Sequence, residues 1–404
     1  DSAPRYHGRD TAVMLAALCG AKTLLGSATP SVESYFNAAT GKYGLVTLAE
    51  RYGGAVLPRV IVSDTLRAAK RGEKRSHFNK ALLDRIGEAL QAGSQAILFQ
   101  NRRGFSPYVE CGHCGWTANC PDCNVSLTYH KSDGSLRCHY CGYRIPVPAV
   151  CPSCGTGSLL PRGFGTEKIE QELAAIFPEA AIDRLDADTS QSAGGYRRIV
   201  EAFEQGRTDI LIGTQIVTKG FDFGGVSLVG ILNADNLLNY PDFRAGERAF
   251  QLMTQVGGRA GRRSEPGTVV IQTAQPQHPV IEQVLRGDYG AMVRSQLAER
   301  RAFFYPPYCR LIAVVMRHRD KELLWRAAGA FAGSAREVFG RRLLGPEAPP
   351  VDRIRGRFLV RFLLKIERRS PSAEAKRLLQ ELFGRLHARA EFRSVEVAAD
   401  VDPM

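Results

Sequence analysis

Residues 209–223 read Asp209-Ile210-Leu211-Ile212-Gly213-Thr214-Gln215-Ile216-Val217-Thr218-Lys219-Gly220-Phe221-Asp222-Phe223. The apolar run that ends at Ile212 predicts a buried β-strand, and the Gly213-Thr214 turn after it predicts the start of a helix. A turn of this kind presents backbone N–H groups to a phosphate. The pattern is weak evidence by itself, so its meaning depends on the sequence around it.

Strands and helices alternate on both sides of this stretch. Apolar runs predict strands at 96–100, 181–185, 209–212, 227–232 and 268–272. Helical spacing of apolar residues predicts helices at 80–91, 196–204 and 244–256, with a further helix that ends at Ile176. This alternation predicts an α/β fold with a parallel sheet covered on both faces.

The ends of the chain predict separate parts. Residues 10–20 and 33–39 have helical spacing and flank a short apolar strand at 23–25, so residues 1–50 form the end of one α/β unit. Residues 51–77 are basic and interrupted by Gly and Pro, which predicts a linker before a second unit at 78–305. Residues 306–404 predict a small α+β domain, with strands at 311–316, 358–366 and 394–397 and helices at 322–339 and 372–386.

Eight of the ten cysteines lie between Cys111 and Cys154, inside a predicted insertion at 108–160. They form four Cys-x-x-Cys pairs: Cys111/Cys114, Cys120/Cys123, Cys138/Cys141 and Cys151/Cys154. Each pair places two sulfurs on one turn, and two turns complete a tetrahedral zinc shell. No secretory signal precedes the block, which favours reduced thiolates over disulfides. Eight thiolates predict two structural Zn²⁺ sites without an open position for catalysis.

The nested pairing of these turns is favoured, and an interleaved pairing stays open. The 14 residues between Cys123 and Cys138 have the length of a hairpin, which joins Cys120, Cys123, Cys138 and Cys141. The outer site then consists of Cys111, Cys114, Cys151 and Cys154. Gly112 and Gly142 are expected to allow the tight turns. Aromatic residues such as Trp116 either stack on bases or form a small core.

Residues 257–262 read Gly257-Gly258-Arg259-Ala260-Gly261-Arg262 and follow an apolar helix. The two arginines are three residues apart, so they project from one face. Two guanidinium groups facing a γ-phosphate would stabilise the charge that develops during hydrolysis. The alternative is a solvated helix end.

Positive charge is concentrated near the C-terminal end. The formal charge is +13, and residues 300–370 hold 17 Lys and Arg against 6 Asp and Glu, a difference of +11. This excess indicates a phosphate-rich partner or, alternatively, a solubilising surface. Arg353, Arg355, Arg357 and Arg361 lie on or beside one predicted strand at odd positions, which share a face. They are expected to hold DNA phosphates, or else to pair with acidic residues of another domain.

Four segments together resemble the motifs of superfamily 2 helicases. Ser27-Ala28-Thr29 is similar to motif III, residues 98–104 to motif IV, residues 213–222 to motif V and residues 255–262 to motif VI. The cysteine block directly after Asn101-Arg102-Arg103-Gly104-Phe105 narrows the resemblance to the PriA family of primosomal helicases. Residues 4–10, 163–167, 242–244 and 400–403 resemble further segments of that family.

The resemblance implies a RecA-like second motor lobe and the end of the first lobe. It implies ATP with Mg²⁺ between the lobes, contacted here by Gly220, Asp222 and Gln255 and by the catalytic arginines Arg259 and Arg262. It implies DNA contacts at Thr214, Gln215 and Lys219. No Gly-x-x-x-x-Gly-Lys-[Ser/Thr] and no Asp-Glu-Glu-His occurs in the chain. In the family these motifs precede the segment where this chain begins, so we expect a C-terminal fragment that is inactive alone.

The implied function is that of an ATP-dependent 3′→5′ DNA helicase that recognises abandoned replication forks and starts primosome assembly. The implied partners are branched and single-stranded DNA, single-stranded DNA-binding protein and other primosome proteins, without a membrane. The implied location is the bacterial cytoplasm at the nucleoid. The alternative is a zinc-containing DNA-binding scaffold of the primosome with a degenerate motor.

Overall fold

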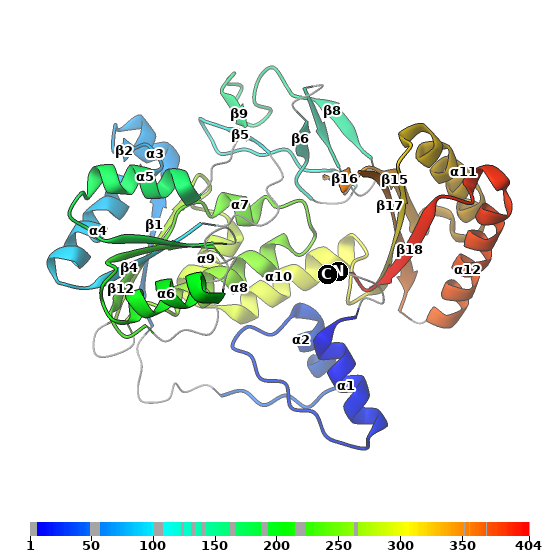
Figure 1. The fold of residues 1–404 in the computed structure, drawn as a ribbon, viewed down its shortest axis with the longest axis horizontal. Coiled ribbons are helices and arrows are strands. Elements are labelled where there is room, and N and C mark those ends of the chain that lie inside the picture. The colour runs from blue at the N-terminus through cyan, green and yellow to red at the C-terminus, as the bar shows by residue number, and fades with distance from the viewer. Residues whose placement is uncertain are drawn as a thin grey trace. The chain divides into compact units, whose positions relative to one another are not determined.

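The computed structural model describes residues 6–403 apart from several short segments: 49–56, 101–107, 123–124, 131–133, 139–141, 162–165, 187–192, 215–222, 262–265, 351, 355 and 369. The chain divides into two compact units. The sheet unit comprises residues 46–298, and the terminal unit comprises residues 1–45 and 299–404. Figure 1 shows the elements of both.

Six parallel strands form the centre of the sheet unit, which confirms the predicted α/β fold. Their order is β1 (Arg59–Asp64), β13 (Thr268–Thr273), β12 (Val226–Ile231), β4 (Gln95–Phe99), β11 (Ile210–Gly213) and β10 (Ile182–Leu185). Every neighbouring pair is parallel, so all six carboxyl ends lie at one edge. We call the two ends of this sheet the carboxyl edge and the amino edge.

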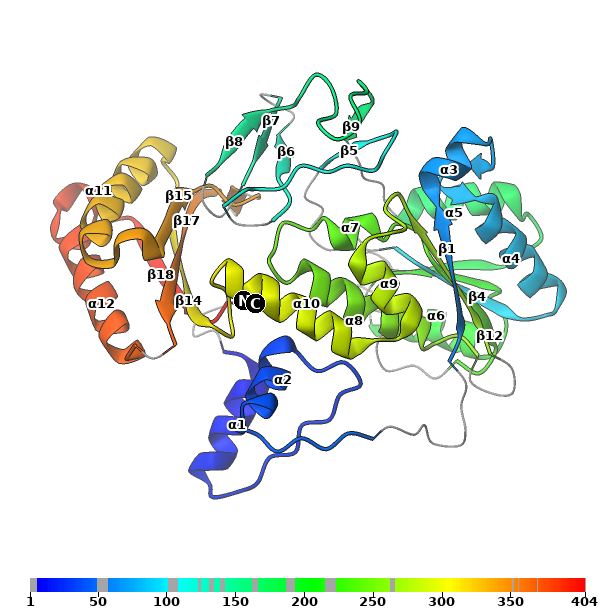
Figure 2. The same ribbon diagram turned by 180° about the vertical axis from the view of Figure 1, so that it is seen from behind.

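Helices cover both faces of this sheet (Figure 2). Leu82 and Ile86 of α4 (Lys80–Gln91) and Ile169 of α5 (Thr166–Ile176) pack on Leu98 and Ile212. On the other face lies α8 (Ala245–Gly257), while α6 (Ala193–Glu204) contacts β10. Strands whose residues are buried on both faces have continuous apolar sequences, and for this reason the sequence identified them.

The prediction of a linker at 51–77 is wrong for residues 57–77, the part of this range that the structure describes. Residues 59–64 form β1, which pairs with β13 from Arg59↔Thr268 to Asp64↔Thr273. The side chain of Asp64 then caps α3 (Thr65–Lys70), and the short strands β2 (Lys74–Arg75) and β3 (Phe78–Asn79) follow. An edge strand is less buried than a central one, which explains why its apolar signal is weak. The sequence interpretation also missed α7 (Asp235–Leu238), α9 (Pro279–Arg286) and α10 (Tyr289–Ala302).

The cysteine-rich insertion follows β4 and has two small sheets. In the outer sheet, β5 (Val109–Cys111) pairs antiparallel with β9 (Leu159–Pro161). The inner sheet consists of β6 (Thr128–His130), β7 (Ser135–Arg137) and β8 (Arg144–Pro146). The insertion therefore begins and ends on the same antiparallel pair.

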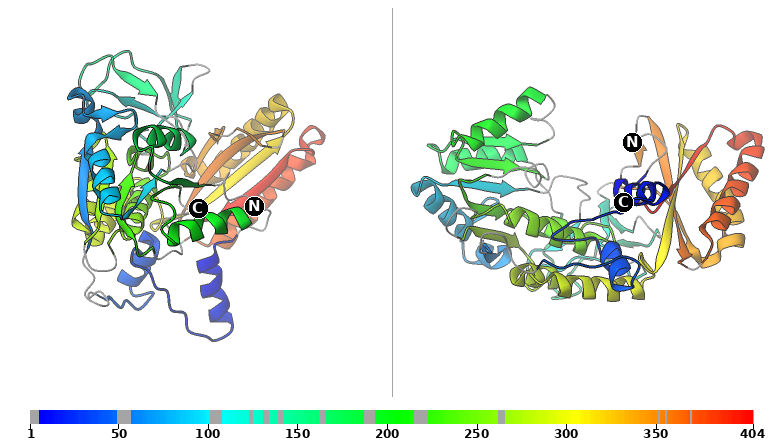
Figure 3. Two further views of the ribbon diagram at one scale, coloured as in Figure 1. Left: turned by 60° about the vertical axis from the view of Figure 1, so that its left-hand side comes forward. Right: turned by 90° about the horizontal axis from the view of Figure 1, so that it is seen from below.

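The terminal unit contains the predicted α+β domain. Its antiparallel sheet has the order β15 (Leu343–Glu347), β17 (Arg357–Glu367), β14 (Cys309–His318) and β18 (Glu396–Val401), with β16 (Arg353–Ile354) beside β17. Helices α11 (Lys321–Phe339) and α12 (Ser372–Ala388) cover one face, where alternate residues of β14 and β17 form the core (Figure 3).

The N-terminal residues of the terminal unit form α1 (Gly8–Leu18) and α2 (Val32–Ala39). The predicted strand at 23–25 is wrong, because these residues have no strand pairing and Leu24 is 96% exposed. A short apolar run forms a strand only beside a partner strand, and the described residues offer none here.

Among the described helices, none combines the length and the apolar character that a membrane crossing requires.

Candidate zinc and nucleotide sites

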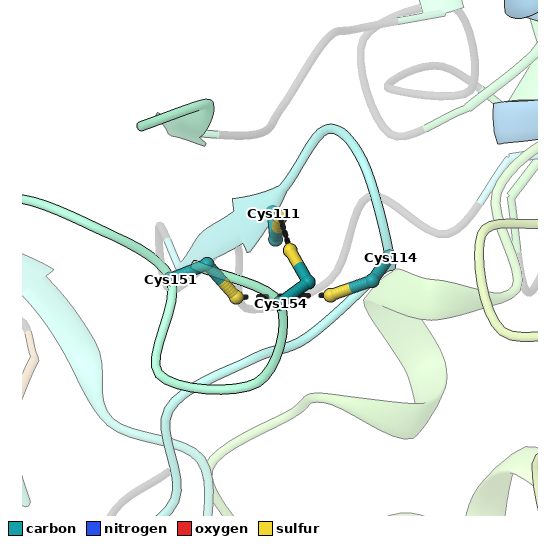
Figure 4. A group of neighbouring side chains, drawn as sticks. All are labelled: Cys111, Cys114, Cys151 and Cys154. Carbon is teal, nitrogen blue, oxygen red and sulfur yellow. Dashed lines mark hydrogen bonds between the residues drawn. The ribbon is translucent and has the colours of Figure 1, made fainter. Parts of the chain in front are cut away.

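The outer four cysteines lie together. The Sγ atoms of Cys111, Cys114, Cys151 and Cys154 all lie within 4.8 Å of one another. Figure 4 shows their side chains converging from two turns. Cys111 Sγ is 3.6 Å from Cys154 Sγ, and Cys114 Sγ is 3.7 Å from Cys151 Sγ. The structure thus brings together the outer set that the nested pairing predicts.

All four Cys-x-x-Cys turns share one backbone hydrogen bond. The amide of the first cysteine donates to the carbonyl oxygen five residues later, as Cys111 does to Trp116 (2.8 Å) and Cys151 to Thr156 (2.7 Å). The same bond joins Cys120 to Val125 and Cys138 to Tyr143. The first cysteine of each pair thus has the same backbone pairing.

The glycines that permit these turns differ in part from the expectation. Gly115, Gly142 and Gly155, each four residues after a first cysteine, have φ of 75°, 83° and 74°. The expectation for Gly142 is therefore confirmed. Gly112 has no such backbone conformation; a Cβ there would lie 2.6 Å from Ser158 Oγ, so close packing requires this glycine.

The thiols of the outer site differ in pKa. Burial opposes ionisation of Cys111, but hydrogen bonds from Thr156 Oγ1 and from the amides of Cys114 and His113 lower its pKa to about 6. Desolvation and the neighbouring sulfurs raise the pKa of Cys114 to about 12. A dication would stabilise all four thiolates at once. Four soft sulfur donors in a tetrahedral group fit Zn²⁺.

The inner set is described in part. Cys120 and Cys138 are buried, and both begin turns of the common kind. Cys123 and Cys141 lie outside the described residues, so the assembly of this set stays a prediction.

The outer site is packed against the sheet unit's own strands and helices. A Cβ at Gly115 would lie 2.5 Å from the carbonyl oxygen of Ala274, directly after β13. Thr117 Oγ1 donates to Asn239 Oδ1 (3.1 Å), just after α7. Both contacts lie at the carboxyl edge, so the first cysteine turn is fixed there.

Thr214 also lies at the carboxyl edge. It follows β11 directly, its side chain is 7% exposed, and its amide is 3.4 Å from the carbonyl oxygen of Leu185. The other two predicted DNA contacts in this segment, Gln215 and Lys219, lie outside the described residues.

The motif VI residues lie at the opposite edge. The Gly261 amide donates to the carbonyl oxygen of Val226, the first residue of β12 (3.0 Å). Arg259 therefore lies near the amino edge, one helical turn after the exposed Gln255. Arg262, Gly220 and Asp222 lie outside the described residues.

Sequence reasoning missed two buried carboxylates at the carboxyl edge. Asp186 is fully buried after β10 and accepts a 2.6 Å hydrogen bond from Thr166 Oγ1. Asp235 accepts from Thr273 Oγ1 (2.6 Å) and from the Ala274 amide (2.8 Å). Each aspartate stands shortly after a strand of the parallel sheet, and this position was the available signal.

The arginines of the C-terminal domain do not lie on one strand. Arg353 belongs to β16, which forms a hairpin with β17 and pairs Ile354 with Arg357. Arg357 and Arg361 share one face of β17, and Arg355 lies outside the described residues. Acidic side chains also lie near these arginines. Arg357 forms an ion pair with Glu396 of β18, and Glu367 pairs with Arg342.

Three sequence families match parts of the chain. The PriA DNA helicase Cys-rich region (CRR) domain matches residues 120–146, the helicase conserved C-terminal domain residues 165–264, and the primosomal protein N C-terminal domain residues 301–404. The first two families fit the inner cysteine turns and the parallel sheet, and the third fits the antiparallel sheet of the terminal unit.

Curated relatives match nearly the whole chain. Replication restart protein PriA of Bacillus subtilis is 38% identical over 99% of this chain and 49% of its own length. Its counterpart from Haemophilus influenzae is 38% identical over 99% of this chain and 54% of its own length. The chain thus spans about half the length of these relatives.

Among solved structures, RecG bound to a three-way DNA junction gives a TM-score of 0.38 at 15% identity, over 69% of this chain and 27% of RecG. That likeness is too low to support an assignment. The identity to the curated relatives and the two family-specific domains do support one. The chain belongs to the PriA family of replication restart proteins.

Proposed function

We propose that this chain is the C-terminal part of an ATP-dependent 3′→5′ DNA helicase that recognises abandoned replication forks and starts primosome assembly. The observation that carries the proposal is the 38% identity to replication restart protein PriA over 99% of the chain. The geometry agrees with a motor, because among the described candidates Arg259 lies near the amino edge of the sheet and Thr214 at its carboxyl edge.

Arg259, near the amino edge, and Arg262 act on the phosphates of ATP, and Gln255, Gly220 and Asp222 contribute to the same nucleotide site. When bound, ATP with Mg²⁺ supplies the free energy of hydrolysis. The guanidinium groups are always charged and bind phosphate oxygens through two hydrogen bonds. The rest of the nucleotide site belongs to the half of the relatives that this chain lacks, so the chain alone is expected to be inactive.

Thr214, at the carboxyl edge, contacts the DNA backbone together with Gln215 and Lys219. Polar and cationic side chains that bind phosphates fix the register of the protein without reading the sequence. In the terminal unit, Arg353, Arg355, Arg357 and Arg361 form a second contact with branched DNA. The ion pair with Glu396 competes with DNA for Arg357.

Two Zn²⁺ ions hold the insertion, one in the outer and one in the inner cysteine set. Their role is structural, since four thiolates leave no open position. The insertion and the C-terminal domain offer surfaces for single-stranded DNA-binding protein and other primosome proteins.

The salt dependence of DNA binding tests the DNA part of this proposal. The logarithm of the affinity of the chain for forked DNA should fall linearly with log salt, by about 0.7–0.9 for each phosphate contact. Replacing Arg353, Arg355, Arg357 and Arg361 by Gln should flatten the slope by roughly three units.

Two comparisons make this test sharper. Arg357→Gln alone should change the slope least, and Arg377→Gln should leave it unchanged, because Arg377 pairs with Glu381 on the exposed side of α12. An unchanged slope with a lower Tm in the quadruple variant would assign the arginines to domain packing instead.

A further inference from the structure

The terminal unit joins two segments that are distant in the chain. Glu33 of α2 and Arg300 at the end of α10 form an ion pair across 267 residues. Among the described residues 6–48, Thr29 and Val32 alone are buried, and they flank the start of α2. The N-terminal segment is therefore attached to the rest of its unit mainly around α2.

The first attachment is a buried guanidinium. Arg300 is 1% exposed, and its Nη1 donates to Glu33 Oε1 (3.2 Å) and to the carbonyl oxygen of Pro306 (3.3 Å). A buried charge is costly without an opposite partner. Burial of Arg300 therefore holds Glu33 in place.

The second attachment lies just after β17. Arg368 Nη2 donates to Asn37 Oδ1 (3.1 Å), and its guanidinium lies 5.1 Å from the ring centre of Phe36. The same ring meets Tyr308 edge to face, with 5.5 Å between ring centres. One turn of α2 is thus held by a cation–π contact, a hydrogen bond and an aromatic pair.

Strand β17 connects this attachment with the proposed DNA contacts. Arg357, Arg361 and Lys365 lie on one face of the strand, because they are separated by even numbers of residues. Lys365 Nζ donates to the carbonyl oxygen of Phe303 (2.9 Å) and lies 3.8 Å from the ring centre of Tyr305. One continuous strand therefore carries arginines at one end and the attachments of α2 at the other.

Hydrogen bonds tie the loop before α2 to that helix, so the two move together. The Ser31 side chain caps α2 by accepting from the Ser34 amide, and Arg9 Nη1 donates to both serine hydroxyls. Within the loop, the Thr29 amide donates to Ser27 Oγ (3.1 Å). A displacement of α2 would move Ser27-Ala28-Thr29 with it.

We infer that Arg300 and Arg368 are positioning residues through which the C-terminal domain holds the loop at 27–30. DNA bound to the domain then changes the mobility of this loop. The domain thus binds DNA and also influences the motif III loop of the motor. The DNA part of this inference rests on the proposed function, while the attachment itself does not.

Hydrogen exchange of the α2 amides tests both parts on the 404-residue chain. Glu33→Gln removes the carboxylate that pairs with the buried Arg300, so α2 amides should exchange about tenfold faster. Arg368→Gln should have a smaller effect in the same direction. Arg326→Gln, which breaks the exposed pair with Glu391 in the same unit, should leave α2 unchanged.

The second arm adds a single-stranded oligonucleotide. In the unaltered chain, bound DNA should slow exchange in α2. In Glu33→Gln and Arg368→Gln this response should disappear while the affinity for DNA stays the same, a result that a purely structural role would not produce.

Each outcome decides one part. Exchange in α2 that is unaffected by Glu33→Gln would overturn the attachment. DNA binding without any response in α2 would overturn the coupling and leave the proposed function intact. Absence of DNA binding would contradict the DNA part of the proposed function and the coupling together, and the first arm would still decide the attachment.

Discussion

The two edges of the parallel sheet are built in different ways. At the amino edge a Cβ at Gly267 would lie 2.4 Å from the Gly261 nitrogen, and the neutral amide of buried Gln95 donates to the carbonyl oxygens of Phe203 and Thr208. At the carboxyl edge the buried carboxylates of Asp186 and Asp235 join buried amides in making the close contacts. Gln272 is fully buried. Its side chain accepts a hydrogen bond from the Asn79 amide (2.7 Å) and donates to the carbonyl oxygens of His77 and Leu232.

This difference suggests that the two edges have different functions. The backbone packing of the amino edge lies next to Arg259, the described arginine that we propose to bind an anion. The buried carboxylates and amides of the carboxyl edge hold loops and the first cysteine turn at fixed positions. Helix α8 runs between the edges and spans about 20 Å, since each of its 13 residues adds about 1.5 Å. A change at one edge can therefore reach the other through a single helix.

Loss of a zinc ligand should have the largest effect, because structural zinc supplies folding free energy on the order of 10 kcal/mol. Cys154→Ser and Cys120→Ser should each reduce the bound zinc from about two ions to one. Only Cys154→Ser should also loosen the carboxyl edge, since the outer site contacts Ala274 and Asn239. Metal analysis and hydrogen exchange after β13 measure the two effects. One ion or none in the reduced, unaltered protein would refute the two-site assignment.

Removal of a candidate nucleotide-binding arginine should be next in size. The test requires the extended protein, meaning this chain together with the half of its relatives' length that it lacks. Arg262→Ala should lower ATP turnover by a factor of roughly 10³, as for arginine fingers. Affinity for DNA should barely change. Arg207→Ala is a control, because Arg207 is an exposed arginine shortly before β11. Turnover near the unaltered rate would exclude the finger role.

Neutralising Asp235 tests the stiffness of the carboxyl edge. Asp235→Asn weakens two charged hydrogen bonds, so the free energy of unfolding of the sheet unit should fall by about 2 kcal/mol. For a unit of this size the Tm should fall by roughly 4–8 °C. Asp209→Asn is the matched change near the amino edge, where Asp209 receives the Ala181 amide. Equal losses in both variants would remove the distinction between the edges.

Acid should weaken the carboxyl edge slightly. Burial opposes ionisation of Glu172, but hydrogen bonds from His77 and Ser76 lower its pKa below the usual value. A carboxyl whose pKa is lower in the folded state stabilises the fold above its unfolded pKa, and this contribution disappears as pH falls through the folded pKa. Thermal unfolding of Glu172→Gln should therefore depend less on pH between about 5 and 3. Glu88→Gln, which breaks a surface pair with Arg85, should retain the original dependence.

The central strands, the long helices and the cysteine turns could be predicted from the sequence because each has strong local periodicity or spacing. Strand β1 could not, because an edge strand is recognised mainly by its partner, here 209 residues further along the chain. The hairpin of β16 and β17 was missed for a related reason. Gly356 has φ of 77°, and the sequence alone does not separate a turn glycine from a glycine inside a strand.

The candidate site was predictable where the chemistry is local. The cysteine turns and the Gly257–Arg262 segment carry their functional side chains within a few residues. Asp186 and Asp235 were not found, because their partners Thr166 and Thr273 come from other elements of the fold. The partner of Arg357 was missed likewise, since Glu396 lies 39 residues away on β18.

The most direct test of a motor with separate nucleotide and DNA edges is ATP hydrolysis by the extended protein, measured with and without forked DNA. The account predicts hydrolysis that DNA stimulates and that Arg259→Ala and Arg262→Ala abolish while DNA remains bound. Tight DNA binding by an unaltered protein that hydrolyses no ATP would contradict it and would favour a zinc-containing DNA-binding scaffold.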